Sequence, residues 1–192
     1  MFHFFAYISR LHLIKRWGLM RSTREENTQE HSWQVAVVAH ALAVISNRLF
    51  GGQLDEGRVA VLALYHDVSE TVTGDLPTPV KYANSEIERV FHALEDAAVE
   101  ELAGKLPAEL QPHFRPVLLP QPGPEEELVH IADKLCAYLK CAEELQSGNQ
   151  EFEVAFAAAA AKMEKYAARP EVAYFMEHFV PSFSLTLDEL KK

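Results

Sequence analysis

Four side chains in three distant parts of the sequence could together bind one divalent metal ion. They are His31, the adjacent pair His66 and Asp67, and Asp133. Two imidazoles and two carboxylates form a mixed nitrogen and oxygen ligand set that suits a divalent metal in a water-accessible site. If the four meet in space, we expect a metal-dependent hydrolase. If they do not, the chain is a helical protein without this chemistry.

His31 opens a stretch in which apolar residues recur at helical spacing. His40 lies nine positions further on, about half a turn around a helix, and is expected to face away. A lone histidine in this position is more often a satisfied core residue than a ligand, so both interpretations stay open. The apolar residues that share the helical face of His31 are Val35, Val38, Leu42 and Ile45.

His66 ends a second apolar stripe, at its C-terminal side. Asp67 follows directly, and Glu70 lies one helical turn beyond His66, so three polar groups stand within reach of one another. The alternative is a surface cluster that caps a helix end. Val68 and Val72 keep the region apolar, which leaves the two interpretations balanced.

Asp133 lies in a helical stretch with wide apolar coverage. A carboxylate buried there needs a cation or hydrogen-bond donors. The pattern alone slightly favours another interpretation, in which His130, Asp133, Lys134 and Lys140 form a solvated stripe and one of the lysines pairs with the aspartate.

Helices must position these groups, because apolar residues recur at helical spacing almost throughout and no alternating strand is evident. Asn27 and Glu30 are expected to form the capping pair of the first long helix, and residues 50–52 to end it. The prolines make regular helix unexpected at residues 74–79. We predict helices at about residues 27–47, 55–67, 84–104, 107–118, 125–146, 150–168 and 171–179, after a first apolar stripe through Phe4, Ile8, Leu11 and Ile14.

The predicted architecture is therefore all-α, one helical bundle that forms a single domain over residues 1–192. A set of aromatic side chains is expected in its core rather than on a stacking surface. These side chains are Trp33, Phe152, Phe156, Tyr174, Phe175 and Phe179.

Composition limits the function classes. The chain has 192 residues with a net charge of −10, which argues against general nucleic-acid binding, and no apolar run approaches the roughly 20 residues that span a bilayer. Its two cysteines, Cys136 and Cys141, read as reduced thiols, so we expect a cytoplasmic protein without membrane partners. Residues 1–24 hold five basic residues and no acidic ones, which indicates either a local anion site or simple pairing with acidic neighbours.

The order of the histidines and aspartates resembles that of the HD-domain metal-dependent phosphohydrolases. Within that superfamily, the chain is most similar to the bacterial 5′-deoxynucleotidases of the YfbR kind, over essentially its whole length. The loop string GDLPTPVK is the most specific part of the resemblance. The strings that carry it are RW at 16–17, EHS at 30–32, YHDVSE at 65–70, GDLPTPVK at 74–81, ADKLCAYLK at 132–140 and FVPSF at 179–183.

The resemblance implies a homodimer of all-α HD-domain subunits that hydrolyses deoxyribonucleoside 5′-monophosphates, small-molecule substrates, with one divalent metal ion per site, cobalt, manganese or a similar transition metal. It implies His31, His66, Asp67 and Asp133 as the metal ligands. The substrate contacts that it implies are Arg16, Trp17, Asp67, Asp75, Leu76, Pro77, Thr78 and Asp133.

Chemistry suits these assignments. The planar fork of Arg16 matches phosphate, and a bulky Trp17 beside the sugar would reject a ribose 2′-OH. Glu70 or Asp75 could hold the attacking water or protonate the leaving 5′ oxygen, and the sequence does not rank the two. We expect in-line attack by a metal-activated water. The alternatives are an HD phosphohydrolase of nucleoside triphosphates or signalling nucleotides, and a non-catalytic nucleotide-binding helical module.

Overall fold

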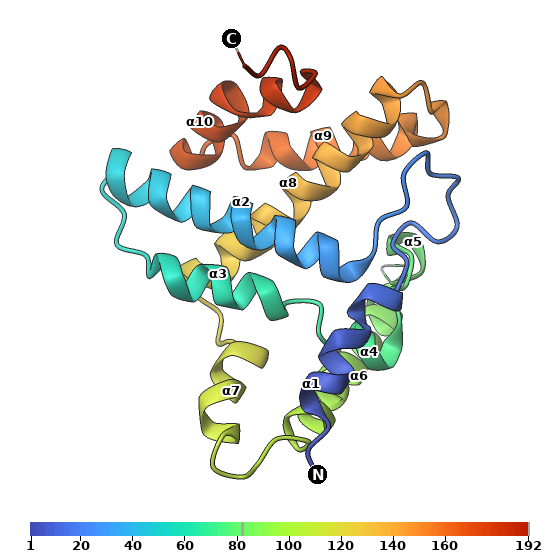
Figure 1. Ribbon diagram of the computed structural model, residues 1–192, viewed down its shortest axis with the longest axis vertical. Coiled ribbons are helices and arrows are strands. Elements are labelled where there is room, and N and C mark those ends of the chain that lie inside the picture. Colours follow the sequence, from blue (N-terminus) through green and yellow to red (C-terminus); the bar gives the residue numbers. More distant parts are fainter. Residues whose placement is uncertain (82, 192) are drawn as a thin grey trace.

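A computed structural model describes residues 1–81 and 83–191, and within them the chain is helical without a strand (Figure 1). One isolated antiparallel bridge joins Lys15 and Asn27. The all-α prediction is confirmed. The elements are α1 (Phe4–Ile8), η1 (Ser9–Leu13), α2 (Thr28–Leu49), α3 (Glu56–Tyr65), α4 (Glu70–Thr73), α5 (Thr78–Lys81), α6 (Ser85–Ala103), α7 (Gln111–Leu118), α8 (Pro124–Gln146), η2 (Gln150–Phe152), α9 (Glu153–Lys165), α10 (Pro170–His178) and η3 (Val180–Ser184), where η denotes a 3-10 helix.

The main core lies where α2, α3 and α8 pack together, with α9 and α10 beyond them (Figure 1). Asn27 caps α2 as predicted, because its side chain accepts a hydrogen bond from the backbone N–H of Glu30 at 3.0 Å. His31 is fully buried at the start of the core-facing stripe, and His40 is exposed. The spacing therefore assigned the two histidines to the correct faces. The stripe consists of Val35, Val38, Leu42 and Ile45, all buried.

A second apolar cluster holds the turn after α3 in place. Phe4 of α1, Val68 of that turn and Leu102 of α6 are fully or almost fully buried within it. Because α3 contributes to the main core and the turn that follows it contributes to this cluster, the two cores belong to a single domain. This packing fixes His66, which lies directly after α3, relative to α2.

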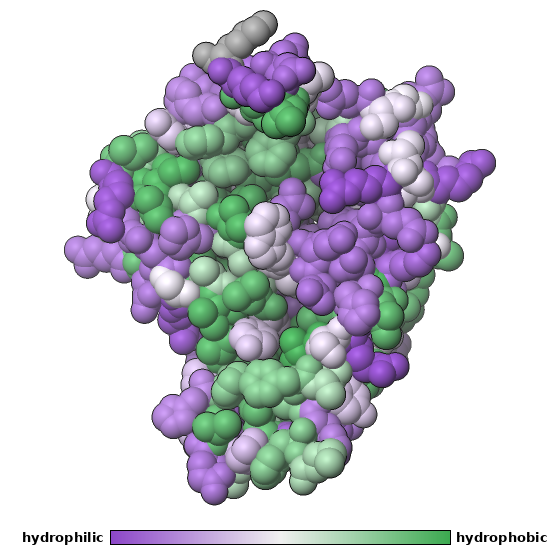
Figure 2. All heavy atoms as spheres, viewed as in Figure 1, coloured by the Kyte–Doolittle hydropathy of each residue, from purple (hydrophilic) through white to green (hydrophobic). Residues whose placement is uncertain are grey.

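Hydrophobic side chains are also visible on the lower part of the face in Figure 2, where Figure 1 places α1 and α7. Phe5 of α1 is 59% exposed. Among the described residues, no helix combines the length and apolar character needed to cross a membrane.

Some predicted boundaries were wrong. The segment predicted as one helix over 150–168 is split into η2 and α9, and α7 begins at Gln111 because a turn closed by Leu110 N–H and Pro107 C=O precedes it. Residues 74–77 are irregular as expected, but Thr78 and Pro79 enter the single-turn helix α5. Proline is tolerated there because the first helical turn does not use its missing N–H.

Two of the predicted core aromatic residues are not in the core. Trp33 is 65% exposed and Phe179 is 45% exposed, whereas Phe152 and Phe175 are buried. Trp33 follows His31 by two positions, about 200° around α2, so it lies opposite the buried stripe. Helical position, rather than residue type, decided its exposure.

Candidate active site

Three helices bring the predicted ligands together. His31 lies near the N-terminus of α2, His66 directly follows α3, and Asp133 lies in the middle of α8. One ligand atom from each of these three residues lies within 4.8 Å of the other two. The closest approach joins His31 Nε2 and Asp133 Oδ1 at 2.9 Å.

Asp67 completes the cluster. Its Oδ2 atom lies 3.1 Å from His66 Nε2 and 3.8 Å from His31 Nε2. The four residues named from the sequence therefore converge. The alternatives, in which His31 is only a core residue and His66 belongs to a surface cap, do not describe this geometry.

The His66 ring is oriented by the backbone. Its Nδ1 lies 2.7 Å from the carbonyl oxygen of Ala63, which can only accept, so Nδ1 carries the hydrogen. Its Nε2 is buried and makes no well-aligned hydrogen bond within the described part of the chain. Burial alone would lower the pKa of His66, but Asp67 and Asp133 raise it to about 9. With this raised pKa, Nε2 also carries a proton at neutral pH, and its lone pair becomes available to a metal ion once the Nε2 proton leaves.

Both carboxylates are held in the ionised form. Burial by itself would raise the pKa of each. His66 and His31 hold the pKa of Asp67 well below its usual range, and His31 and Lys134 do the same for Asp133. Two carboxylates and two imidazoles, one of them with a buried ring nitrogen that makes no well-aligned hydrogen bond in the described part of the chain, fit a divalent cation.

The solvated stripe considered for α8 is wrong in part. Lys134 Nζ does pair with Asp133 Oδ2 at 2.8 Å, but the other oxygen of Asp133 faces His31. Lys140 is buried and pairs with Glu144, so it does not lie on a solvent-exposed face with His130 and Lys134.

Arg16 reaches the cluster from the segment before α2. Its Nη1 lies 3.4 Å from Asp67 Oδ2, and its side chain is 13% exposed. Burial alone would lower its pKa, but Asp67 and Asp133 raise it beyond its already high usual value. Its backbone N–H donates to the carbonyl of Glu26 at 2.9 Å, so the base of the loop is closed behind it.

Three of the other four basic residues of the N-terminal segment follow the simpler interpretation, in which they pair with acidic neighbours. Lys15 pairs with Glu25, Arg21 with Glu151 and Arg24 with Glu143, and all three cations are largely exposed. Such pairs contribute little to stability. Of these cations, Arg16 is the one whose partner belongs to the cluster.

Trp17 follows with a left-handed backbone, φ 57°, which is uncommon for a bulky residue. Its indole Nε1 donates to Glu26 Oε2 at 2.8 Å, and its ring centroid lies 5.3 Å from that of Phe152. The indole is therefore held on two sides.

Sequence reasoning missed Glu26. Burial alone would raise its pKa, but His31, Arg16 and Trp17 lower it. No regular spacing links Glu26 to the histidines or aspartates, so neither the helical periodicity nor a motif indicated it. Its partner Trp17 lies across a loop closure that only the folded chain shows.

Glu70 and Asp75 differ in environment. Glu70 Oε2 accepts a hydrogen bond from Thr28 Oγ1 at 2.9 Å. Burial, Asp67 and Asp75 raise the pKa of Glu70 to about 8, against the opposing effect of Arg16. Burial also raises the pKa of Asp75, and Arg16 opposes that rise. Glu70 thus holds a proton near neutral pH.

The remaining loop residues are more open. Leu76 is 37% exposed, Thr78 is exposed and Pro77 is half-buried. Their contacts with a substrate stay a prediction.

Comparisons with known proteins show which sequences and structures this chain resembles. A family model described as "5'-deoxynucleotidase YfbR-like" matches residues 3–183. The chain is 54% identical over 195 residues to a curated 5′-deoxynucleotidase of Photorhabdus laumondii, covering 99% of this chain and 97% of that protein. It is also 54% identical over 192 residues to the 5′-deoxynucleotidase YfbR of Escherichia coli O127:H6, covering 99% and 96%.

Solved structures share the fold. An HD-domain phosphohydrolase from Listeria innocua superposes with a TM-score of 0.84 at 26% identity, covering 99% of this chain and 92% of that one. The cyanophage S-2L HD phosphohydrolase bound to dA and one catalytic Zn²⁺ ion superposes with a TM-score of 0.68 at 20% identity, covering 92% and 96%.

Proposed function

The chain belongs to the YfbR-like family and is a 5′-deoxynucleotidase, and from this premise we propose that His31, His66, Asp67 and Asp133 hold the divalent cation of its active site. The enzyme hydrolyses deoxyribonucleoside 5′-monophosphates to the deoxynucleoside and phosphate. The observation that carries the site assignment is the convergence of these side chains beside Arg16.

A bound cation and the Arg16 guanidinium would both contact the phosphate, with different roles. When bound, a divalent cation neutralises phosphate charge and lowers the pKa of a water molecule. The guanidinium of Arg16 binds a phosphate oxygen through its paired N–H groups, in an orientation that Asp67 helps to hold. Water then attacks phosphorus in line with the departing 5′ oxygen: a new P–O bond forms, the P–O5′ bond breaks, and the water gives up one proton to solvent.

Glu70 supplies the proton that the departing 5′ oxygen needs. Thr28 holds its carboxyl group, and the pKa of about 8 keeps that group protonated at neutral pH. A general acid works best with a pKa near the working pH. Asp75 is the alternative; with its place on the loop, we assign it to the sugar instead.

Trp17 selects the deoxyribose. A ring held by Glu26 and Phe152 forms a rigid wall, and a rigid wall beside C2′ rejects an added hydroxyl by steric exclusion. The outer loop residues Asp75, Leu76, Pro77 and Thr78, together with Asp67 and Asp133, complete the proposed substrate contacts.

A single phosphate suits this site better than a triphosphate. Arg16 and Lys134 are the cationic side chains paired with Asp67 and Asp133, and a triphosphate requires more positive charge than these two provide. The mixed nitrogen and oxygen ligands suit cobalt, manganese or a similar transition metal.

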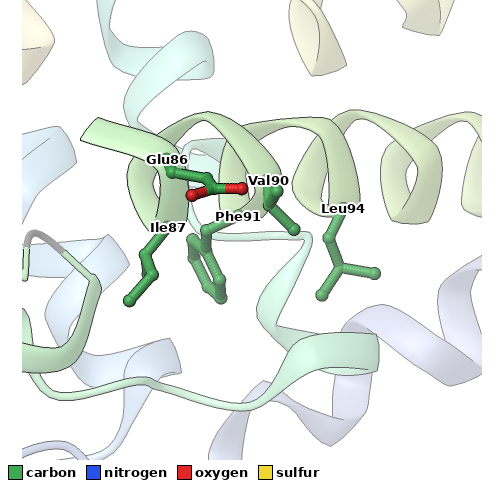
Figure 3. Close-up of a pocket in the computed structure, with 5 residues that line it drawn as sticks. All are labelled: Glu86, Ile87, Val90, Phe91 and Leu94. Carbon is green, nitrogen blue, oxygen red and sulfur yellow. The ribbon is translucent and has the colours of Figure 1, made fainter. Parts of the chain in front are cut away.

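A homodimer is a further part of this proposal. Apolar side chains of α6 line an open pocket, and three of them, Ile87, Val90 and Leu94, are 40%, 55% and 49% exposed (Figure 3). A symmetric contact with a second copy would bury such a surface. Sedimentation velocity tests it: the wild type should sediment as a dimer, Val90→Lys should weaken the dimer, and a monomeric wild type would contradict it.

A cytoplasmic location is also proposed. Its support is the state of Cys136 and Cys141, which are buried and unlinked. Fractionation of cells expressing the protein tests this location, and recovery in the periplasm would contradict it.

A phosphate-release screen tests the catalytic proposal. Purified protein is stripped with a chelator, reloaded with single divalent cations and offered each deoxy- and ribonucleoside monophosphate and the triphosphates. We expect cation-dependent release of inorganic phosphate from deoxynucleoside monophosphates. Release that is insensitive to the chelator would remove the metal site from the mechanism.

A further inference from the structure

Glu26 lies between the proposed metal site and the proposed substrate site. Its side chain is 11% exposed. One oxygen, Oε1, lies 3.6 Å from His31 Nδ1. The other, Oε2, accepts the hydrogen bond from Trp17 Nε1 at 2.8 Å and lies 3.6 Å from Arg16 Nε. Each oxygen therefore faces a different part of the site.

Two of the groups that face Glu26 are buried and otherwise unpaired. Within the described part of the chain, neither His31 Nδ1 nor Arg16 Nε has a hydrogen-bond partner. The opposite ring nitrogen, His31 Nε2, faces Asp133 and Asp67. A histidine that ligates a metal through one nitrogen is normally oriented through the other by a carboxylate or a carbonyl.

The main chain reinforces this arrangement. The carbonyl of Glu26 accepts from Arg16 N–H at 2.9 Å, and the N–H of Thr28 donates to the carbonyl of Ile14 at 3.0 Å. Glu26 is therefore fixed to the same short closure that carries Arg16. The left-handed backbone of Trp17 is a strained conformation that needs such support to persist.

We propose that Glu26 is a positioning residue that couples the metal ligand His31 to the substrate residues Arg16 and Trp17. This inference rests on the proposed function of the site. One carboxylate oxygen orients the His31 ring, and the other holds the indole and the guanidinium. Loss of Glu26 loosens metal binding and sugar selection together, although Glu26 itself touches neither the cation nor the substrate.

Glutamine at position 26 cannot keep both contacts of the glutamate side chain. The amide of Glu26→Gln has one acceptor oxygen and one NH₂ group, so it cannot accept on both sides as the carboxylate does. Glu25→Gln is the matched control, because Glu25 is the adjacent glutamate, is 74% exposed and forms its ion pair with Lys15, away from the site. Both variants change the net charge by the same amount.

The first measurement is cation affinity, by titration of Mn²⁺ into the chelator-stripped full chain. We expect Glu26→Gln to weaken binding about 10- to 100-fold, and Glu25→Gln to match the wild type. The second is the ratio of kcat/KM for dAMP over AMP, which we expect to fall in Glu26→Gln and to stay unchanged in Glu25→Gln.

The third measurement reports on Trp17 without catalysis. Trp33 is the other tryptophan of the chain and is 65% exposed, so Trp33→Phe leaves Trp17 as the sole indole. In that background, we expect Glu26→Gln to increase quenching of Trp17 fluorescence by acrylamide. Thermal unfolding checks that the variants are folded, and the near-isosteric Glu26→Gln is chosen over Glu26→Ala so that the fold is retained.

The outcomes are distinct. A loss of cation affinity together with a lower dAMP over AMP ratio and a more accessible Trp17 supports the coupling. A change in cation affinity alone, or in sugar selection alone, overturns it while the proposed function stands. A wild-type protein that neither binds Mn²⁺ nor hydrolyses dAMP overturns both.

Discussion

His31 Nε2 lies 2.9 Å from Asp133 Oδ1, although 102 positions separate the two residues in the sequence. The contact joins the start of α2 to the middle of α8. It exists because buried apolar stripes on the two helices pack against each other and bring both polar side chains to one place.

Cation binding should release protons. Because the pKa of His66 is about 9 without a cation, its ring holds a proton at pH 7 that must leave before Nε2 can act as a ligand. We expect release of about one proton at pH 7 and tighter binding as the pH rises toward 9. Calorimetry in buffers of different ionisation enthalpy measures the proton number.

The control for proton release is His40→Ala, on the exposed side of α2, which should leave the proton number unchanged. His66→Ala should abolish tight binding. Binding at pH 7 with no proton release would contradict the assigned state of His66.

Substitution of Arg16 should impair turnover of the substrate and leave the affinity for the cation almost unchanged. We expect Arg16→Ala to lower kcat/KM for dAMP about 100- to 1000-fold, as loss of a preorganised donor to developing negative charge does. Arg16→Lys should recover only part, because an ammonium cannot bind bidentately. Steady-state kinetics measure both, and calorimetry should show near wild-type Mn²⁺ affinity.

Arg21→Ala is the matched control for Arg16, because Arg21 pairs with Glu151 on the surface. Its kinetics should match those of the wild type. Unchanged turnover in Arg16→Ala would remove that residue from the mechanism.

Trp17 should set sugar selection. Trp17→Leu removes the rigid wall held by Phe152, so AMP hydrolysis should rise relative to dAMP hydrolysis. The measurement is the ratio of kcat/KM for the two substrates, with Trp33→Phe as the control for loss of an exposed indole. An unaltered ratio would mean that selectivity arises elsewhere.

Glu70 should produce the alkaline limb of the pH profile. A proton donor with a raised pKa is active below that pKa, and its activity is lost as the pH rises through it. We therefore expect kcat to fall with rising pH, with a midpoint at about pH 8 or somewhat lower. The midpoint is lower if a bound cation offsets part of the Asp67 charge that raises the pKa of Glu70. Glu70→Gln should lower kcat about 100-fold or more and abolish this limb. Asp75→Asn should keep the limb; if it removes the limb instead, the two roles are reversed.

Loss of the N-cap of α2 or of α3 should lower the stability of the protein by a similar amount, but only loss of the α2 cap should weaken cation binding at the site. Asn27 accepts from Glu30 N–H and Asp55 from Arg58 N–H, so either alanine substitution should lower the free energy of unfolding by about 1 kcal/mol. Only Asn27→Ala loosens the helix start that carries His31, so only it should weaken Mn²⁺ binding. Urea unfolding and calorimetry measure the two effects.

Local patterns were sufficient for much of the fold. The spacing of apolar residues predicted α2, α3 and α8 and placed His31, but not His40, on the buried face of α2. This success has a local cause, because which face a residue occupies depends on its position within one helix. Trp33 shows the limit: judged by residue type instead of helical position, it was wrongly predicted to be buried.

The sequence alone thus determined the helical class, the main boundaries and the residue types of a metal site. Only the tertiary structure decided that Arg16 pairs with Asp67, that Glu26 lies behind both His31 and Trp17, and that Glu70 rather than Asp75 carries the more strongly raised pKa. The physical reason is that ion pairing, burial and field strength depend on distances between elements remote in the chain. Those distances are set by packing, which no local periodicity encodes.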